Sequence, residues 1–194
     1  MYDFVKRIFD LFFSIIILLI ISPVLIISIT LLKYESKGPV FFFQDRLGLY
    51  GVVFKVFKLR TMTHKNRKVH KQVFKNDPEV TKVGYYLRRY KIDELPQFIN
   101  VLMGSMAVVG PRPCLTNIEH LYNQDTKFRF KVKPGVTSLA GVRGSIYLSW
   151  PEKWHYDKIY AENANLLLDL KIIIKTVLVV LIGEKQFLKI PKIK

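Results

Sequence analysis

The sequence contains little cysteine and few acidic residues. Cys114 is the only cysteine among 194 residues, which excludes a disulfide framework or a thiolate metal cluster within one chain and fits a location facing the cytoplasm. Acidic residues number 15 against 31 lysines and arginines, so the formal net charge is +16 at pH 7. Because 50% of the residues are hydrophobic, a disordered basic tail is also excluded. This composition favours anionic lipid surfaces and phosphorylated or nucleic-acid ligands as partners.

Charge is absent from a long run near the N-terminus, residues 11–32. At about 1.5 Å per residue, a helix of this length measures roughly 33 Å and can cross the hydrocarbon core of a bilayer. The run is too long for a cleavable signal peptide, and no small-residue cleavage pattern follows it. It therefore predicts a membrane helix.

Two features leave the topology of this helix open. Ser22 and Pro23 lie at its middle, where proline removes a backbone hydrogen bond. Basic residues such as Lys6 and Lys33 flank both ends, so the distribution of positive charge gives no orientation. A helix that enters the membrane, breaks at Pro23 and returns to the same face satisfies both observations. A kinked helix that spans the membrane once is the alternative.

The remainder of the chain is predicted to be one α-rich α+β domain. Alternating residues at 40–44 and 52–57 predict a β-hairpin around the turn-rich segment 48–51. Residues 63–78 are polar and basic and are expected to form an exposed loop or surface helix. No repeat or low-complexity linker divides the chain, so we expect a membrane segment over 1–33 and one catalytic or binding domain over 34–194.

The pattern also predicts four helical stretches. The last of them, 152–183, is interrupted near residue 164. Its final part is apolar nearly all round, with Lys171 and Lys175 on one side. Such a helix is either part of the core or an amphipathic helix in the membrane interface, and the nearby membrane segment favours the interface. The predicted helices are 80–89, 93–103, 115–130 and 152–183, with an ordered loop over 104–113 and an irregular segment over 134–150.

Adjacent carboxylates at Asp93 and Glu94 are the strongest candidates for chemistry. Proline is tolerated in the first turn of a helix, so Pro96 predicts that both lie at a helix start, where backbone N–H groups favour anions. One interpretation is an N-capping Asp followed by a favourable first-turn Glu. The other is a carboxylate nucleophile beside a carboxylate that holds a hard cation such as Mg²⁺.

Basic residues at specific places support the second interpretation. Lys58 and Arg60 end a predicted strand, Arg88 precedes the acidic pair, and Arg112 is held between Pro111 and a second proline. A guanidinium fixed in this way suits two-pronged recognition of phosphate. Each cation taken alone could equally be a solvated surface charge. The acidic pair, the fixed arginine and the membrane helix together indicate phosphoryl chemistry on a lipid-borne substrate.

The sequence also resembles the bacterial sugar transferases, small monotopic phosphoglycosyl transferases that load a sugar phosphate onto polyprenyl phosphate. The resemblance runs nearly from end to end, and its specificity lies in an ordered series of motifs. In chain order these are Lys6–Asp10, Ser22–Pro23, Gly38–Gly48, Phe57–Met62, Asp93–Gln97, Asn100–Leu102 and Val109–Pro113.

The resemblance implies a mostly helical α+β fold with a re-entrant membrane helix that breaks at Ser22–Pro23. It implies a location in the bacterial inner membrane, with the catalytic domain and interfacial amphipathic helices on the cytoplasmic side. Asp93 would be the nucleophile and Glu94, beside it, the main Mg²⁺ ligand. The expected substrate-binding residues are Lys58, Arg60, Arg88, Pro111, Arg112 and Arg143.

The implied reaction moves a sugar 1-phosphate from a UDP-sugar to polyprenyl phosphate through an aspartyl phosphosugar and releases UMP. It would be the first membrane step in the assembly of a capsule, exopolysaccharide, O-antigen or glycoprotein glycan. The partners are then a UDP-sugar, polyprenyl phosphate and the bilayer, without nucleic acid; a homodimer is compatible with the sequence. A membrane-bound basic adaptor without activity is the competing class.

One segment departs from the family pattern. Where the family usually has Pro-Gly-Ile-Thr-Gly-Trp-Ala-Gln-Val-Asn-Gly-Arg-Asn, this chain has Pro134-Gly135-Val136-Thr137-Ser138-Leu139-Ala140-Gly141-Val142-Arg143-Gly144-Ser145-Ile146. The Gln, the Asn and the second Arg are missing at their places, although Arg143 is close by. The acidic pair is intact, so activity is expected, although an inactive family member remains an alternative. The identity of the sugar is left open.

Overall fold

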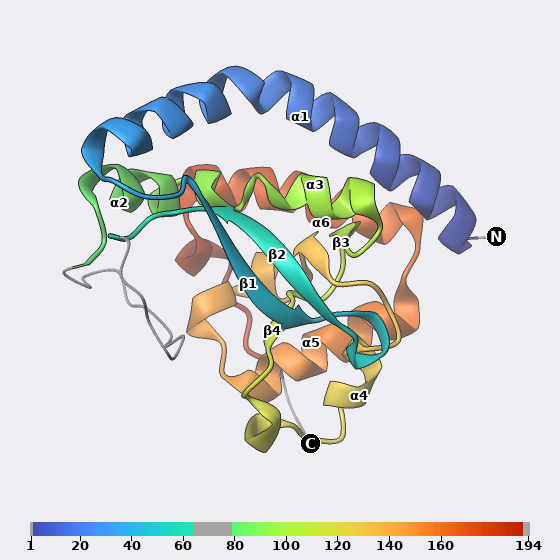
Figure 1. Cartoon of the computed structure of the whole chain (residues 1–194). Coiled ribbons are helices and arrows are strands. Elements are labelled where there is room, and N and C mark those ends of the chain that lie inside the picture. Colours follow the sequence, from blue (N-terminus) through green and yellow to red (C-terminus); the bar gives the residue numbers. More distant parts are fainter. Residues whose placement is uncertain (1, 64–78, 192–194) are drawn as a thin grey trace.

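The computed structural model describes residues 2–63 and 79–191. A long N-terminal helix, α1 (Tyr2–Glu35), lies on one side of the molecule above α2 (Lys82–Arg89), α3 (Gln97–Met103) and α6 (Leu166–Ile182) (Figure 1). The β-hairpin, α4 (Thr126–Arg129) and α5 (Trp150–Asn163) lie on the opposite side. The predicted loop or helix at 63–78 falls almost wholly outside the described residues. The fold is mostly helical with two small sheets, as the sequence predicts.

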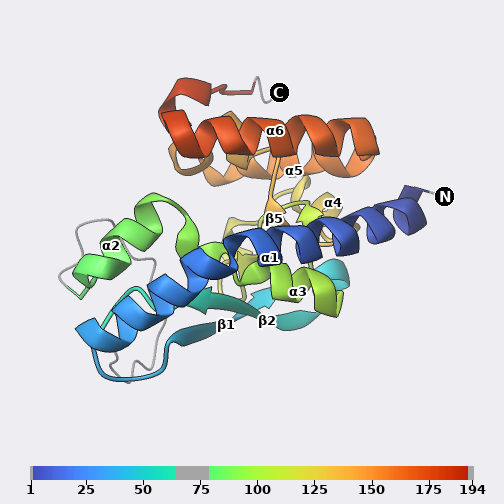
Figure 2. The same ribbon diagram turned by 90° about the horizontal axis from the view of Figure 1, so that it is seen from above.

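Helix α1 is long and apolar enough to cross a membrane. It stays helical through Pro23, so the predicted break in the helix is wrong; instead α1 is a continuous curved helix (Figures 1 and 2). Pro23 cannot donate to the carbonyl of Leu19, and the hydroxyl of Ser22 donates to that oxygen instead, at 2.8 Å. This hydrogen bond is the physical reason that the helix continues, because a free carbonyl is costly in an apolar environment.

Both ends of α1 contact the same domain. At the start, Lys6 donates to the fully buried carboxylate of Asp169 on α6, at 2.8 Å. Arg7 donates to two carbonyl oxygens at the end of α3, at 2.6 and 2.9 Å. At the other end, the carboxylate of Glu35 accepts from the backbone N–H of Val83 at the start of α2. Most apolar side chains between these contacts face outward, among them Phe12, Leu19, Ile20 and Ile26.

The predicted hairpin is present. Strands β1 (Phe41–Leu47) and β2 (Val53–Leu59) pair antiparallel, with Phe41 opposite Leu59, around the short 3₁₀ turn η1 (Leu49–Gly51). A two-residue strand, β4 (Cys114–Leu115), pairs with the other edge of β1. The hairpin places the end of β2, with Lys58, beside η2 (Ile92–Glu94).

Two predicted stretches, 115–130 and 104–113, have a different structure from the one expected. The stretch 115–130 is not one helix: it contains the end of β4, the turn η3 (Glu119–Leu121) and the single helical turn α4. The side-chain oxygen of Asn123 accepts from the N–H groups of Asp125 and Thr126, a local turn that competes with helix formation. The predicted loop 104–113 contains a buried strand, β3 (Ala107–Val109), which pairs parallel with β5 (Gly135–Thr137).

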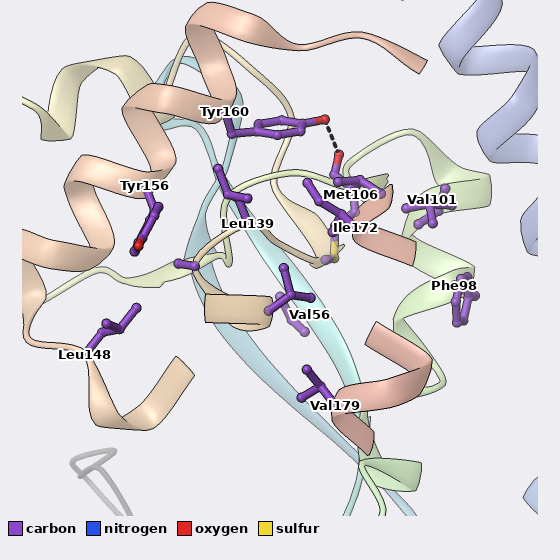
Figure 3. Close-up of a cluster of buried hydrophobic side chains, with 14 residues drawn as sticks. Val56, Phe98, Val101, Met106, Leu139, Leu148, Tyr156, Tyr160, Ile172 and Val179 are labelled. Carbon is purple, nitrogen blue, oxygen red and sulfur yellow. Dashed lines mark hydrogen bonds between the residues drawn. The ribbon is translucent and has the colours of Figure 1, made fainter. Parts of the chain in front are cut away.

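The core joins these elements around β3 and β5. Its buried side chains come from β2, α3, α5 and α6, and the hydroxyl of Tyr160 on α5 donates to the carbonyl of Val109 on β3 at 3.0 Å (Figure 3). Helices α5 and α6 are separated near residue 164, as predicted. The core thereby fixes Val109, directly before the loop 110–113, while Cys114 after the loop is buried in a second cluster with Ile118 and Trp154.

Helix α6 has one buried and one exposed apolar face. Ile172 and Val179 are buried in the core, whereas Leu167, Ile174 and Leu181 are 61%, 62% and 76% exposed. In an α-helix, residues at this spacing lie on one face. One face of α6 is therefore part of the core, and the other is an apolar face exposed on the described structure.

Candidate active site

The acidic pair lies in a 3₁₀ turn that precedes α3. Asp93 and Glu94 belong to η2, and α3 begins only at Gln97, after Pro96. The prediction that the pair starts a helix is therefore wrong in detail. Lys91 has a left-handed backbone with φ of 58°, and this conformation separates η2 from α2. The carboxylates are presented by a tight connection between two helices rather than by a helix dipole.

Glu94 is held by two cations from distant parts of the chain. Lys58 on β2 donates to its Oε1 at 2.8 Å, and Arg112 donates to its Oε2 at 2.5 Å. Charge-assisted contacts of this kind are among the stronger hydrogen bonds in proteins. These contacts bring together the predicted site residues Lys58, Glu94 and Arg112, which lie far apart in the sequence.

The two carboxyl groups have opposite electrostatic environments. Burial and the charge of Glu94 raise the pKa of Asp93 to about 6, although Lys58, Arg88 and Lys91 act against the shift. Burial also favours protonation of Glu94, but Arg112 and Lys58 outweigh it and hold its pKa well below the usual range. Glu94 is the permanent anion of the pair, whereas Asp93 has the higher proton affinity.

The loop that carries Arg112 is braced by close backbone contacts. A Cβ added at Gly110 would lie 2.2 Å from the carbonyl oxygen of Lys133, and one added at Gly135 would lie 2.1 Å from the nitrogen of Gly110. Both positions therefore require glycine. The guanidinium of Arg112 also donates to the carbonyl of Val136. Arg112 is thus fixed by β5 as well as by Glu94.

Other predicted site residues lie in different surroundings. Arg88 donates to the hydroxyl of Thr61 at 2.8 Å, and its charge acts on Asp93. Arg60 is buried and donates to the carbonyls of Ser36 and Lys37 after α1. It therefore holds the connection from α1 to the hairpin rather than a group beside Asp93.

Arg143 and Pro111 also have defined places. Arg143 lies in the 3₁₀ turn η4 (Gly141–Arg143), where its backbone carbonyl accepts from Lys189 N–H and its charge acts on Lys175. Within the described residues, Arg143 makes no hydrogen bond or ion pair with Asp93 or Glu94. The carbonyl of Pro111 accepts from the N–H of Gly135 at 2.9 Å, so Pro111 helps to brace the loop of Arg112.

Three further residues support the site, and two of them, Gln97 and Asn100, belong to the family motifs. Gln97 is fully buried, with its side-chain oxygen 3.5 Å from a nitrogen of Arg112. Asn100 bonds the backbone of β2 at both Phe57 and Lys55. Arg129 donates to the carbonyl of Arg112. In the sequence, only their positions in the family motifs could have indicated the contacts of Gln97 and Asn100. A single amide side chain in a helix does not change the hydrophobic pattern and so gives no signal of its own.

Asp93 and Glu94 are the acidic side chains of the site that could ligate a metal ion. Among the described residues, no group of three or more His, Cys, Asp or Glu side chains could hold one. Mg²⁺, however, commonly uses one or two carboxylates and completes its shell with water and substrate phosphates. Asp93 and Glu94 fit this mode of binding, with a diphosphate as the other source of oxygen ligands.

Comparison with known proteins decides the family. Residues 1–183 match the model of the family described as bacterial sugar transferase. The chain belongs to this family.

Named relatives extend the comparison. The uncharacterized sugar transferase EpsL of Bacillus subtilis (strain 168) is 40% identical over 179 residues, which cover 92% of this chain and 88% of EpsL. A UDP-glucose:undecaprenyl-phosphate glucose-1-phosphate transferase of Klebsiella pneumoniae is 44% identical over 89% of this chain and 39% of its own length. A UDP-N-acetylgalactosamine-undecaprenyl-phosphate N-acetylgalactosaminephosphotransferase of Aeromonas hydrophila is 35% identical, covering 94% and 45%.

The electrostatics of the pair can be tested by titration. Glu94→Gln removes the negative charge beside Asp93 but leaves Lys58 and Arg88, so the pKa of Asp93 should fall from about 6 by roughly one unit or more. Carbon-13 NMR of carboxyl-labelled aspartate in metal-free protein measures this. Glu162→Gln, at an exposed position on α5, should leave the pKa of Asp93 unchanged. A pKa that stays at 6 or rises in Glu94→Gln would contradict the coupling.

Proposed function

We propose that this protein transfers a sugar 1-phosphate from a UDP-sugar to polyprenyl phosphate and releases UMP. The observation that carries the proposal is an acidic pair, a buried Asp93 beside a Glu94 held by two cations, in a protein with a long outward-facing apolar helix. Relatives in the same family are named for this reaction with undecaprenyl phosphate and either UDP-glucose or UDP-N-acetylgalactosamine. The product would be a sugar attached to polyprenyl diphosphate in the membrane. We therefore propose that the reaction is the first membrane step in the assembly of a surface polysaccharide.

The proposed chemistry has two displacements at one phosphorus atom. A carboxylate oxygen of Asp93 bonds to the sugar-bearing phosphorus, and the bond from that phosphorus to the bridging oxygen breaks, so UMP leaves with the bonding electrons. An oxygen of polyprenyl phosphate then attacks the same phosphorus and releases the carboxylate. Because Asp93 is recovered unchanged, soluble and lipid substrates can use one site in turn, which predicts ping-pong kinetics.

Cations of the site act on the transferring group. Arg112 is fixed by the loop and β5, and its guanidinium can exchange part of its contact with Glu94 for a phosphate oxygen. Lys58 reaches the same carboxylate from β2. These charges oppose the repulsion between the Asp93 carboxylate and an anionic diphosphate.

We propose Mg²⁺ as the cofactor, held by Glu94 with Asp93 beside it. When bound, Mg²⁺ would neutralise charge on the diphosphate and the departing UMP. Glu94 is suited to this because its neighbours keep it ionised.

We propose that α1 is re-entrant and that both its ends lie on the cytoplasmic side of the bacterial inner membrane. Support comes from the contacts of Lys6 with α6 and of Glu35 with α2, because both helices belong to one domain. A helix that crosses a hydrocarbon core of about 30 Å separates its two ends by that core. The exposed face of α6 would lie in the same interface.

Turnover tests the catalytic assignment. Asp93→Asn has nearly the same shape but lacks the nucleophilic carboxylate, so release of UMP from a UDP-sugar in the presence of Mg²⁺ and polyprenyl phosphate should fall by about a thousandfold or more. The matched control is Asp45→Asn, at an exposed position on β1, which should retain wild-type turnover. Wild-type rates in Asp93→Asn would reject Asp93 as the nucleophile.

Cysteine labelling tests the topology. In a Cys114→Ser background, single cysteines at exposed Asp3 and at Tyr34, which is 94% exposed, report the two ends of α1. Both should resist a membrane-impermeant thiol reagent in intact bacterial cells and react after permeabilisation. Labelling of either position from outside the cells would reject the re-entrant arrangement.

A further inference from the structure

The loop 110–113 has few backbone donors of its own. Pro111 and Pro113 lack an N–H group, so the segment makes few hydrogen bonds through its own amides. Its carbonyl oxygens depend on donors from elsewhere in the chain, because most backbone carbonyls in a folded protein are hydrogen-bonded. The first of them, on Pro111, accepts from the N–H of Gly135 at 2.9 Å. The next two accept from side chains.

Both of these side chains are arginines. Arg129, the last residue of α4, donates from Nη2 to the carbonyl of Arg112. Arg46 on β1 donates from Nη1 to the carbonyl of Pro113 at 3.1 Å. Two guanidinium groups from different elements therefore hold adjacent carbonyls, and the first of these belongs to the residue whose side chain contacts Glu94.

Arg129 is itself fixed from several sides. Its side chain is only 4% exposed, and its guanidinium lies over the ring of Trp154 on α5, 4.4 Å from the ring centre. The carboxylate of Asp157, three residues further along α5, lies 3.5 Å from Nη1. An aromatic face and a carboxylate together set the plane of a guanidinium. Arg129 thus offers the loop a donor in a fixed place.

Arg46 is held within the hairpin. Its Nη2 donates at 2.6 Å to the side-chain oxygen of Gln44, two residues earlier on the same face of β1. Burial and the charge of Arg112 lower the pKa of Arg46 to about 10, whereas the charge of Glu94 acts in the opposite direction. Arg46 therefore remains a cation at neutral pH and lies within electrostatic range of both members of the ion pair at the site.

The position of the loop determines what the guanidinium of Arg112 can reach. Its Nη2 lies 2.5 Å from Glu94, and its Nη1 donates to the carbonyl of Val136. The side chain of Arg112 is 33% exposed, so a phosphate can approach it, whereas Arg129 is enclosed. Because a misplacement of about 1 Å in a catalytic group can lower a rate about a hundredfold, small movements of the loop matter.

We propose that Arg46 and Arg129 are positioning residues that fix the loop 110–113 and thereby aim the guanidinium of Arg112 at the transferring phosphate. The inference rests on the proposed function. Since the two arginines act from different elements on adjacent carbonyls, either can be altered while the other still holds the loop. Lysine is the informative replacement because it keeps the charge but lacks the planar fork that joins a loop carbonyl to a second partner.

A double-mutant cycle tests the inference through UMP release from UDP-glucose or UDP-N-acetylgalactosamine with Mg²⁺ and polyprenyl phosphate. Arg46→Lys and Arg129→Lys should each lower kcat about tenfold or more. If they act through the guanidinium of Arg112, adding either to Arg112→Lys should change the rate less than about twofold. The matched control is Arg60→Lys, at a buried arginine that donates to carbonyls outside the loop. Its effect should be the same with and without Arg112→Lys.

Nitrogen-15 NMR of arginine-labelled protein without substrate measures the positioning independently of turnover. A guanidinium held at both Nη atoms rotates slowly about its Nε–Cζ bond, so Arg112 should give separate Nη signals, which Arg112→Lys identifies by their loss. In Arg46→Lys and Arg129→Lys these signals should broaden or merge while the amide spectrum stays that of a folded protein. Arg60→Lys should leave them separate.

Additive losses of rate in the double variants, or Arg112 signals that stay separate in both lysine variants, would overturn the inference. The two variants are independent, so if one does not fold the other decides. The two measurements also separate this inference from the proposed function. UMP release with unchanged Arg112 signals supports the transferase and rejects the positioning roles. Merged signals in a protein that releases no UMP support the positioning and reject the proposed chemistry.

Discussion

The carboxylate of Glu94 is the contact on which the site depends. One oxygen is held by Lys58 at the end of β2 and the other by Arg112 in the loop after β3. Without these cations, the negative charge of Glu94 beside the buried Asp93 would favour protonation of one of the two carboxylates. With them, Glu94 is a fixed anion, and the hairpin, the turn η2 and the loop 110–113 meet at one point. The glycines at 110 and 135 allow that meeting because a side chain at either would displace the backbone.

A second constraint concerns the long apolar helix α1. Asp169 is fully buried on α6, yet it accepts from Lys6 and Tyr2 at the start of α1. Buried charges persist when they are paired, and removing one partner is costly. This pairing holds the polar start of α1 on the domain while its apolar middle faces outward. The proposed lipid substrate would then arrive at the same side of the domain that carries the exposed faces of α1 and α6.

Much of this could be predicted from the sequence. The uncharged run 11–32, the hairpin and the paired helices α5 and α6 followed from composition and periodicity, because each element's pattern is local. The errors arose where a contact distant in sequence or a local side-chain bond decides the structure. Ser22 supplies a hydrogen bond in place of the one that Pro23 cannot make, Asn123 forms a local turn within a stretch predicted as one helix, and β3 pairs with the distant β5. Within the site, Lys58 and Arg112 were expected near the pair, but Arg60 serves a buried connection.

The most direct test of the account is intact-protein mass spectrometry of the wild-type protein mixed with Mg²⁺ and its UDP-sugar, without polyprenyl phosphate. The account predicts a mass gain of one sugar phosphate, located to Asp93 by peptide mapping. Addition of polyprenyl phosphate should remove the adduct. UMP release without any adduct, or an adduct on a different residue, would contradict the account.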